Sequence, residues 1–470
     1  MLNFKNKKVT VMGLGSYEDG SGISAVRFLL SQGAKVTVTD MKTKEQLAEQ
    51  IKRLSKLAKK IKFVLGEHHE SDFISADLIV RNPGVPKSSK YLKISKDNGV
   101  PIETDISIFF QLVDRKRIIA VTGTRGKSTT TTLIYQLIGT SDKKAVLGGN
   151  ITKSPLAQMA QVKKGGAIIL ELSSWLLESL GTIKRSPHIA VFTNIYPDHL
   201  NTYEDIDDYA AAKKNIFAWQ NLQDYVILNR DNKYTRAMGK EVPSQRFWTS
   251  LKKFPIENGC FVSGGRIIYR RDGHEQVICS VKDIMIPGEH NLANVLNAVC
   301  VAMIYGIKPP VIRKVLKNFR GIANRLELLR EIDGVKYYND TTSTTPEATM
   351  AGLKALSNGG KNIILIAGGS DKGLNFTELA KEIKKSCKAV VLFKDSGTVR
   401  LQPLITSEKL PLALAGNMAD AVGIAKSQSK SGDIILLSPA CASFGLFRNE
   451  FDRGDQFRKL VGRININEKI

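Results

Sequence analysis

The sequence predicts an α/β protein of three domains, each built around a parallel sheet. Short apolar runs that fit strands alternate with helical patterns along the whole chain, which is typical of βαβ units. A chain of 470 residues is longer than one hydrophobic core usually serves, so several domains of about 100–200 residues are expected. A glycine-containing segment ending in Lys127-Ser128 lies between a strand and a helix, which predicts a phosphate-binding loop in the central domain.

Three units follow from the order of the predicted elements. Residues 1–114 form a Rossmann-like domain with strands at 9–12, 35–39 and 78–80, a helix at 24–30 and a lysine-rich helix at 43–62. Residues 115–320 form the central P-loop domain, with strands at 118–121, 145–147, 167–170, 188–192 and 225–228 and helices at 291–305 and 311–319. Residues 321–470 form a second Rossmann-like domain with strands at 335–338, 362–366, 389–392 and 433–437.

Composition restricts the class of protein. The 69 lysines and arginines exceed the 45 acidic residues by 24, which favours anionic ligands, but the basic residues are scattered rather than clustered, so we expect no nucleic acid partner. The five cysteines show no metal-ligand spacing and are expected to be reduced. No apolar run approaches the roughly 18 residues of a membrane span, so we expect a cytoplasmic protein without membrane insertion.

The segment from Val121 to Thr130 predicts the chemistry most directly. Backbone N–H groups around Gly123, Thr124 and Gly126 are expected to face phosphates at a helix N-terminus. Lys127 would reach the outer phosphates, and Ser128 would hold Mg²⁺. The loop is a shortened variant, because Val121 stands where a strict P-loop has its first glycine. The ligand is expected to be a nucleoside triphosphate.

The first domain carries an incomplete dinucleotide fingerprint. Gly13 and Gly15 follow the first strand and Asp40 ends the second, but the later glycines, Gly20 and Gly22, require a longer loop than the usual motif. This pattern favours a nucleoside diphosphate bound as a substrate over a nicotinamide cofactor.

Seven ordered motifs extend this interpretation to the whole chain. They are Gly148-Gly-Asn-Ile151, Glu171-Leu-Ser-Ser174, Asn194-Ile-Tyr-Pro-Asp-His199, Tyr209-Ala-Ala-Ala-Lys213, Gly288-Glu-His-Asn-Leu-Ala-Asn294, Asn339-Asp340 and Gly368-Gly-Ser-Asp-Lys-Gly373. In this order they resemble the Mur ligases, ATP-dependent amide-forming enzymes of peptidoglycan synthesis. The Rossmann-like first domain, Asn82-Pro83-Gly84-Val85-Pro86, Ser438-Pro-Ala-Cys-Ala-Ser443 and Arg453-Gly454 are similar to the member that adds D-glutamate to UDP-N-acetylmuramoyl-L-alanine.

The resemblance implies a mechanism and its catalytic residues. ATP phosphorylates the substrate carboxylate, and the amine of D-glutamate displaces phosphate from the acyl phosphate. Lys127, Glu171, His199 and Lys213 are the implied catalytic residues. Two Mg²⁺ ions would be held by Ser128, Glu171, His199 and Lys213, the lysine being carbamylated by CO₂. A monomer is expected.

The resemblance also implies three groups of binding residues. ATP would be bound by Gly123, Thr124, Gly126, Lys127, Ser128, Thr129, Asn291, Asn294, Arg325 and Asp340. The UDP substrate would be bound by Gly15, Ser16, Asp40, Lys42, Asn82, Gly84 and Asn150. The incoming amino acid would be bound by Lys372, Ser443 and Phe451.

Some positions depart from the family pattern. Asn324 stands before Arg325 where a histidine is usual, and Thr342 stands where many members have a lysine, which weakens the choice of amino acid. The alternatives are a Mur ligase that adds another amino acid, including L-glutamate, or a folylpolyglutamate synthetase. The latter lacks the first Rossmann-like unit. A nucleotide-binding oxidoreductase and a nucleic-acid binder are more remote.

Overall fold

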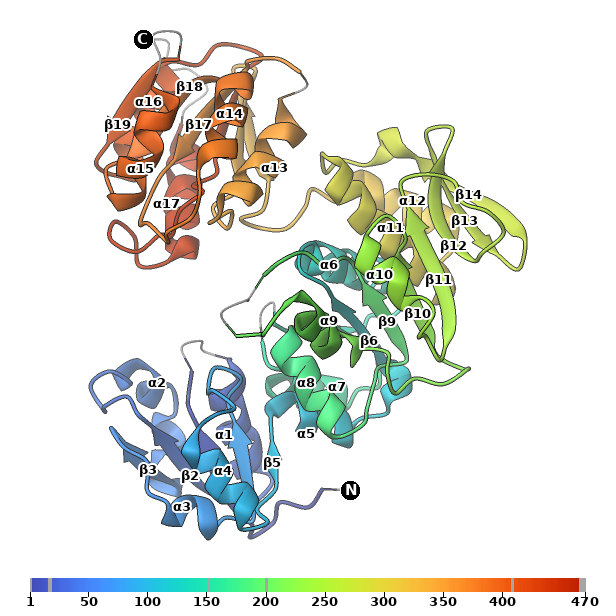
Figure 1. Ribbon diagram of the computed structural model, residues 1–470, viewed down its shortest axis with the longest axis vertical. Helices are drawn as coiled ribbons and strands as arrows, with labels where there is room; N and C mark the ends of the chain where they lie inside the picture. Colours follow the sequence, from blue (N-terminus) through green and yellow to red (C-terminus); the bar gives the residue numbers. More distant parts are fainter. Residues whose placement is uncertain are drawn as a thin grey trace. The chain divides into compact units, whose positions relative to one another are not determined.

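The computed structural model describes residues 2–15, 19–150, 153–198, 202–357, 359–406 and 410–464. It contains three sheets in two compact units, Met1–Val281 with Ala293–Val315, and Lys282–Leu292 with Leu316–Ile470 (Figure 1). The α/β fold class is therefore confirmed. Within the described ranges, no helix is both long and apolar enough to span a membrane.

The first sheet is parallel and has the strand order β3-β2-β1-β4-β5. Its strands are β1 (Lys8–Met12), β2 (Lys35–Asp40), β3 (Ile61–Leu65), β4 (Leu78–Arg81) and β5 (Ile102–Glu103). Its helices are α1 (Ser21–Ser31), α2 (Ala48–Arg53), α3 (Ser71–Ile74), α4 (Lys90–Asp97) and α5 (Asp105–Leu112). Buried residues of α1 and α5 share one apolar cluster, and those of α3 and α4 share another, so helices cover both faces.

The second sheet has nine strands in the order β14-β13-β12-β11-β10-β9-β6-β8-β7. Its strands are β6 (Ile118–Thr122), β7 (Val146–Gly149), β8 (Ile168–Glu171), β9 (Ile189–Phe192), β10 (Tyr225–Asn229), β11 (Gln245–Ser250), β12 (Gly259–Ser263), β13 (Arg266–Arg271) and β14 (His274–Ser280). The helices of this region are α6 (Lys127–Ile138), α7 (Met159–Val162), α8 (Ser174–Thr182), α9 (Ile206–Lys214), α10 (Lys233–Met238), α11 (Glu289–Ile304) and α12 (Pro309–Asn318).

The third sheet has the order β15-β16-β20-β17-β18-β19. Its strands are β15 (Glu327–Ile332), β16 (Val335–Asn339), β17 (Ile363–Ala367), β18 (Cys387–Phe393), β19 (Leu412–Ala415) and β20 (Ile434–Leu437). Its helices are α13 (Pro346–Leu356), α14 (Thr377–Ser386), α15 (Ser396–Ile405), α16 (Met418–Ser427) and α17 (Glu450–Arg463). Alternate residues of β17 join two different apolar clusters, one with α13 to α15 and the other with α16 and α17. The sheet is therefore covered on both faces, which explains its continuous apolar strands.

Two local predictions are wrong. The lysine-rich segment 43–62 is not one helix, because α2 is short, a 3₁₀ helix follows at Ser55–Lys60, and β3 begins at Ile61. The sheets are also less uniformly parallel than predicted, since β12-β13, β13-β14 and β15-β16 pair antiparallel. The β13-β14 hairpin turns at Asp272-Gly273, a turn signal that the sequence does contain.

Candidate functional site

The segment predicted to bind phosphate connects β6 to α6, so it lies between a strand and a helix as expected. Gly126 is the N-cap residue of α6 and has a φ of 82°, a left-handed conformation that favours glycine. A Cβ atom on Gly126 would lie 2.1 Å from Oδ1 of Asn294, so a larger residue would also clash. The N-terminal N–H groups of α6, which include those of Ser128 and Thr129, have no partner within the helix. This end of α6 is suited to bind an anion.

The loop that follows β9 fixes the conformation of the phosphate loop. The backbone N–H of Thr124 donates to the carbonyl oxygen of Asn194 at 2.9 Å, and the N–H of Arg125 donates to Oδ1 of the same asparagine at 2.9 Å. Thr193 Oγ1 donates to the carbonyl oxygen of Arg125 at 2.6 Å. The loop is therefore fixed before any nucleotide binds, which reduces the conformational entropy lost on binding.

Lys127 and Lys213 meet at the start of this loop. Lys127 Nζ donates to the carbonyl oxygens of Gly123 and Thr124 at 2.9 and 3.0 Å. Lys213, on α9, is only 1% exposed; its Nζ donates to the same Gly123 oxygen at 3.3 Å and lies 4.7 Å from the ring centroid of Tyr209. Burial and the charge of Lys127 hold the pKa of Lys213 well below its usual value. Lys213 is thus a buried amine that loses its proton readily.

Glu171 ends β8 beside β6, at the carboxyl edge of the sheet. Its Oε1 accepts a hydrogen bond from Asn150 Nδ2 at 3.2 Å, whereas its Oε2 is buried without a hydrogen-bond partner among the described residues. A buried carboxylate oxygen of this kind fits a ligand for a hard cation such as Mg²⁺. No group of three or more His, Cys, Asp or Glu side chains within the described ranges is arranged to hold a metal, so Mg²⁺ would need the other predicted ligands as well.

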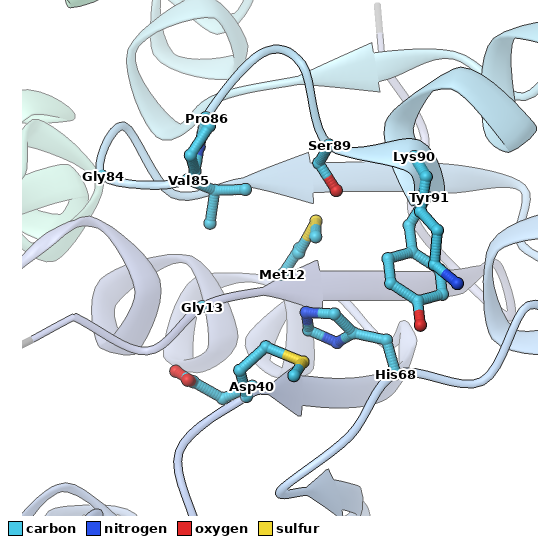
Figure 2. A pocket seen from close by; sticks show the side chains of 11 residues that line it. Met12, Gly13, Asp40, His68, Gly84, Val85, Pro86, Ser89, Lys90 and Tyr91 are labelled. Carbon is cyan, nitrogen blue, oxygen red and sulfur yellow. The ribbon is translucent and has the colours of Figure 1, made fainter.

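The first sheet has a cavity of about 330 Å³ at its carboxyl edge (Figure 2). Residues at or just after the ends of β1, β2 and β4 line it, and they include Gly13, Asp40 and Gly84. Asp40 Oδ2 accepts a hydrogen bond from the N–H of Leu14 at 3.0 Å, and its Oδ1 accepts one from the N–H of Lys42 at 3.0 Å. The predicted substrate residues Asp40 and Gly84 therefore share one cavity.

The same cavity contains an aromatic pair that the sequence did not single out. Figure 2 shows the rings of His68 and Tyr91 beside each other, and their centroids are 4.9 Å apart in an edge-to-face arrangement. His68 Nδ1 is 2.6 Å from Thr39 Oγ1, and burial lowers the pKa of His68. Nearby, Asn82 Oδ1 accepts from the N–H of Gly84 at 3.0 Å. Asn82 Nδ2 would lie 3.0 Å from a Cβ placed on Gly15.

In the other unit, two of the residues predicted to bind the incoming amino acid, Lys372 and Ser443, lie on loops that pair with each other. The N–H of Ser370 donates to the carbonyl oxygen of Ala442 at 3.0 Å, and the N–H of Ala442 donates back at 3.1 Å. This brings the segments that carry Lys372 and Ser443 side by side. Lys372 Nζ donates to Thr344 Oγ1 at 3.2 Å, which adds a hydroxyl that sequence reasoning missed. Ser443 is 2% exposed and Phe451, in the first turn of α17, is 45% exposed.

Asp340 and Arg325 differ in their surroundings. Asp340 follows β16 and is 4% exposed; Oδ1 accepts from the N–H of Leu326 at 3.1 Å and Oδ2 from Ser438 Oγ at 2.8 Å. Burial raises the pKa of Asp340 to about 6. Arg325 is exposed and directly precedes Leu326, whose N–H donates to Asp340. Asp340 therefore already serves as a structural anchor, and a contact with ribose would use its remaining lone pairs.

Asn291 and Asn294, the two residues predicted to lie near the adenine of ATP, are both on α11. Asn294 Oδ1 accepts a hydrogen bond from Thr130 Oγ1 at 3.4 Å, which joins α11 to α6 behind the phosphate loop. Asn291 Nδ2 donates to the carbonyl oxygen of Pro287 at 2.7 Å. Ser16 and His199, predicted to contact the UDP substrate and Mg²⁺, lie outside the described residues.

Comparison with known proteins identifies the family. Sequence models of the Mur ligase MurD-like N-terminal domain, the Mur ligase middle domain and the Mur ligase glutamate ligase domain match residues 7–104, 121–302 and 324–441. The chain belongs to the Mur ligase family.

Curated relatives narrow the comparison to one member of that family. The chain is 40% identical to the UDP-N-acetylmuramoylalanine–D-glutamate ligase of Roseiflexus sp. (strain RS-1), a match that covers 98% of this chain and 99% of the relative. Proteins with the same name from Borreliella afzelii (strain PKo) and Koribacter versatilis (strain Ellin345) are 38% and 37% identical, covering 97% and 100% of this chain and 98% and 100% of their own lengths.

Solved structures agree on the fold. The UDP-N-acetylmuramate–alanine ligase MurC of Thermotoga maritima has a TM-score of 0.59 at 18% identity, with 97% of this chain and 99% of that chain covered. A pseudomurein peptide ligase type C from Methanothermus fervidus has a TM-score of 0.58 at 19% identity, with 98% and 100% covered.

Proposed function

We propose that this chain is an ATP-dependent ligase that joins D-glutamate to UDP-N-acetylmuramoyl-L-alanine, with release of ADP and phosphate. The observation that carries the proposal is the phosphate loop at the N-terminus of α6, with Lys127, Lys213 and Glu171 converging on it. Full-length relatives named for this reaction support the choice of substrates. The alternative is the same chemistry with another amino acid, because Thr342 replaces a common family lysine.

The phosphate loop has the groups that phosphoryl transfer needs. The N–H groups of Gly126 to Thr129 and the ammonium of Lys127 would bind the ATP phosphates and offset the charge that develops during transfer. Mg²⁺, held by Ser128, Glu171, His199 and Lys213, would supply further neutralisation of the phosphate charge. The orphaned Oε2 of Glu171 supports this assignment. The product of this step is an acyl phosphate of the substrate carboxylate.

Lys213 would act as a carbamate. Its lowered pKa increases the fraction of unprotonated amine, and only that form attacks CO₂. The nitrogen lone pair forms a bond to carbon, one C=O electron pair moves to oxygen, and a proton leaves the nitrogen. The resulting carboxylate replaces a cation that would repel Mg²⁺, and its negative charge would balance Lys127.

The other residues would bind the two substrates to be joined. The cavity that Asp40 and Gly84 line would hold the uridine diphosphate. Gly15, Ser16, Lys42, Asn82 and Asn150 are the further residues proposed to bind the UDP substrate. Lys372, Thr344 and Ser443 supply a cation and two hydroxyls suited to the carboxylates of an acidic amino acid. The amine would then attack the acyl phosphate, forming the C–N bond as phosphate leaves. ATP would contact Asn291, Asn294, Arg325 and Asp340. We propose a cytoplasmic monomer.

Phosphate release by the purified protein tests the proposal. The assay would contain ATP, Mg²⁺ and UDP-N-acetylmuramoyl-L-alanine, with D-glutamate, L-glutamate, L-alanine, L-lysine or meso-diaminopimelate. Release that requires D-glutamate and yields the amide product is expected. If only a different amino acid supported turnover, the proposed ligase chemistry would stand and D-glutamate would be the wrong substrate. If none of the five amino acids supported turnover, the proposed function would be contradicted.

A further inference from the structure

Arg453, on α17, is a fully buried cation, and within the described ranges its hydrogen-bond acceptors are all oxygen atoms of uncharged groups. Its side chain is 0% exposed, and among the described residues no acidic side chain forms an ion pair with it. Burying an unpaired charge costs several kcal/mol unless hydrogen bonds replace the lost water. Burial lowers the pKa of Arg453 to about 10, so the guanidinium is still charged at neutral pH. Its acceptors must therefore supply that compensation.

The acceptors of Arg453 that the structure describes lie on two loops. Nε donates to Thr341 Oγ1 at 3.0 Å and Nη2 to the Thr341 carbonyl oxygen at 2.8 Å, both on the loop after β16. Nη1 lies 3.4 Å from the carbonyl oxygens of Cys441 and Ala442, on the loop after β20. Strands β16 and β20 are parallel neighbours, with Asn339 opposite Leu437, so both loops leave the same edge of the sheet.

Close packing of α17 places Arg453 between these loops. A Cβ on Gly454 would lie 2.5 Å from both Asn324 Oδ1 and Thr341 Cγ2, so only glycine allows this approach. Asn339 Nδ2 donates to the carbonyl oxygen of Gly454 at 3.2 Å, and Thr341 Oγ1 donates to that of Glu450 at 2.9 Å. The first turns of α17 are thus fixed to the loop after β16, and the guanidinium extends from there to the second loop.

Each loop carries residues assigned to a different substrate. The loop after β16 contains Asp340, assigned to ATP, and the loop after β20 contains Ser443, assigned to the amino acid. We propose that Arg453 is a positioning residue that fixes the spacing of these two loops and thereby couples the binding of ATP to the binding of the amino acid. The coupling rests on the proposed function, whereas the fixed spacing does not.

The guanidinium is required for this role. Its Nε, Nη1 and Nη2 point in different directions within one plane, so one side chain reaches acceptors on both loops. A lysine keeps the charge but has a single nitrogen, which cannot match this geometry. Arg453→Lys therefore keeps the positive charge and removes the three-nitrogen geometry of the guanidinium, whereas Arg453→Met removes both. Lys459→Met is the matched control, since Lys459 is an exposed cation on the same helix.

Amide hydrogen exchange tests the fixed spacing without reference to catalysis. In Arg453→Lys, exchange is expected to rise about tenfold in residues 339–344 and 438–443 together, because opening of the loops becomes easier. Exchange in β17 and in the phosphate loop should stay at the wild-type level, and Lys459→Met should match the wild type throughout. Unchanged exchange in both loops, or a rise over the whole unit, would refute the positioning role.

Steady-state kinetics test the coupling. Arg453→Lys is expected to raise the KM for ATP and for the amino acid by about tenfold each, which corresponds to roughly 1.4 kcal/mol, and to leave the KM for the UDP substrate unchanged. In the wild type, saturating amino acid should lower the KM for ATP, and this effect should be lost in the variant. Equal changes in all three KM values would overturn the proposal. A wild type without amino-acid-dependent turnover would instead contradict the proposed function and leave the exchange result standing.

Discussion

The Nζ atoms of Lys127 and Lys213 donate to the same acceptor, the carbonyl oxygen of Gly123, at 2.9 and 3.3 Å. Two ammonium groups at one buried acceptor repel each other, which is part of the reason why the pKa of Lys213 is lowered. The arrangement makes chemical sense if only Lys127 keeps its positive charge. A carbamate on Lys213 would turn this repulsion into attraction.

We predict that Lys213→Ala loses nearly all turnover and recovers part of it when acetate is added, because a small carboxylate can occupy the vacated position. Lys214→Ala is the matched control: Lys214 follows directly on α9, and its Nζ pairs with Glu241 Oε2 at 2.7 Å on the exposed side. It should keep wild-type activity. Phosphate release with and without acetate is the measurement, and equal activity of the two variants would exclude the carbamate.

We predict that Lys127→Ala lowers phosphate release by about a hundredfold to a thousandfold, because the developing phosphate charge loses a preorganised cation. Lys127 lies in the first turn of α6 and is only partly buried, so the variant should fold. Melting temperature and circular dichroism would check the fold, with Lys143→Ala as an exposed control. Near-normal turnover by folded Lys127→Ala would disprove the assignment of the phosphate loop.

The position of the proposed phosphate loop between a strand and a helix could be predicted because it depends on local sequence. Gly126 needs a left-handed φ and Lys127 starts the helix, and both requirements act within a few residues. The alternation of strands and helices could be predicted for the same reason, because the spacing of apolar residues along the sequence differs between a strand and a helix.

Other parts of the site depend on contacts between distant residues, which one sequence does not reveal. His68 lies at the cavity because it contacts Thr39 and Tyr91, which are distant in sequence. Thr344 contacts Lys372 because the sheet brings their two loops together. The short strands β3 and β12 were missed because each depends on pairing with a neighbour for its stability.

We predict that the cavity beside Asp40 distinguishes uracil from cytosine. Uracil carries an N–H donor at N3, where cytosine has an acceptor, and the Asp40 carboxylate can only accept. Wild-type protein should therefore bind UMP at least about tenfold more tightly than CMP, because CMP would leave the Asp40 carboxylate without this hydrogen-bond donor. Asp40→Asn should reduce this preference, whereas Asp97→Asn, an exposed change on α4, should not. Calorimetric titration measures both affinities, and equal affinity of the wild type for the two nucleotides would contradict the prediction.

We predict that Asp340 makes stability depend on pH. Burial raises the pKa of Asp340 to about 6 from the ordinary value of 3.8, so the folded protein holds this proton more tightly than the unfolded chain. The stabilisation from this group is fully present below the unfolded pKa and is lost as the pH rises through the folded pKa. Ionised Asp340 should therefore cost on the order of 2 kcal/mol at pH 7 relative to pH 4.

Asp340→Asn removes this titration. The melting temperature of the variant minus that of the wild type should therefore increase between pH 4 and pH 7, even if the amide loses one hydrogen bond at every pH. Glu347→Gln, an exposed change on α13, should show a constant difference over the same range. Calorimetric scans at several pH values provide the test. A pH-independent difference for Asp340→Asn would mean that the carboxyl is ionised in the folded protein throughout, stabilised by Ser438 and the N–H of Leu326.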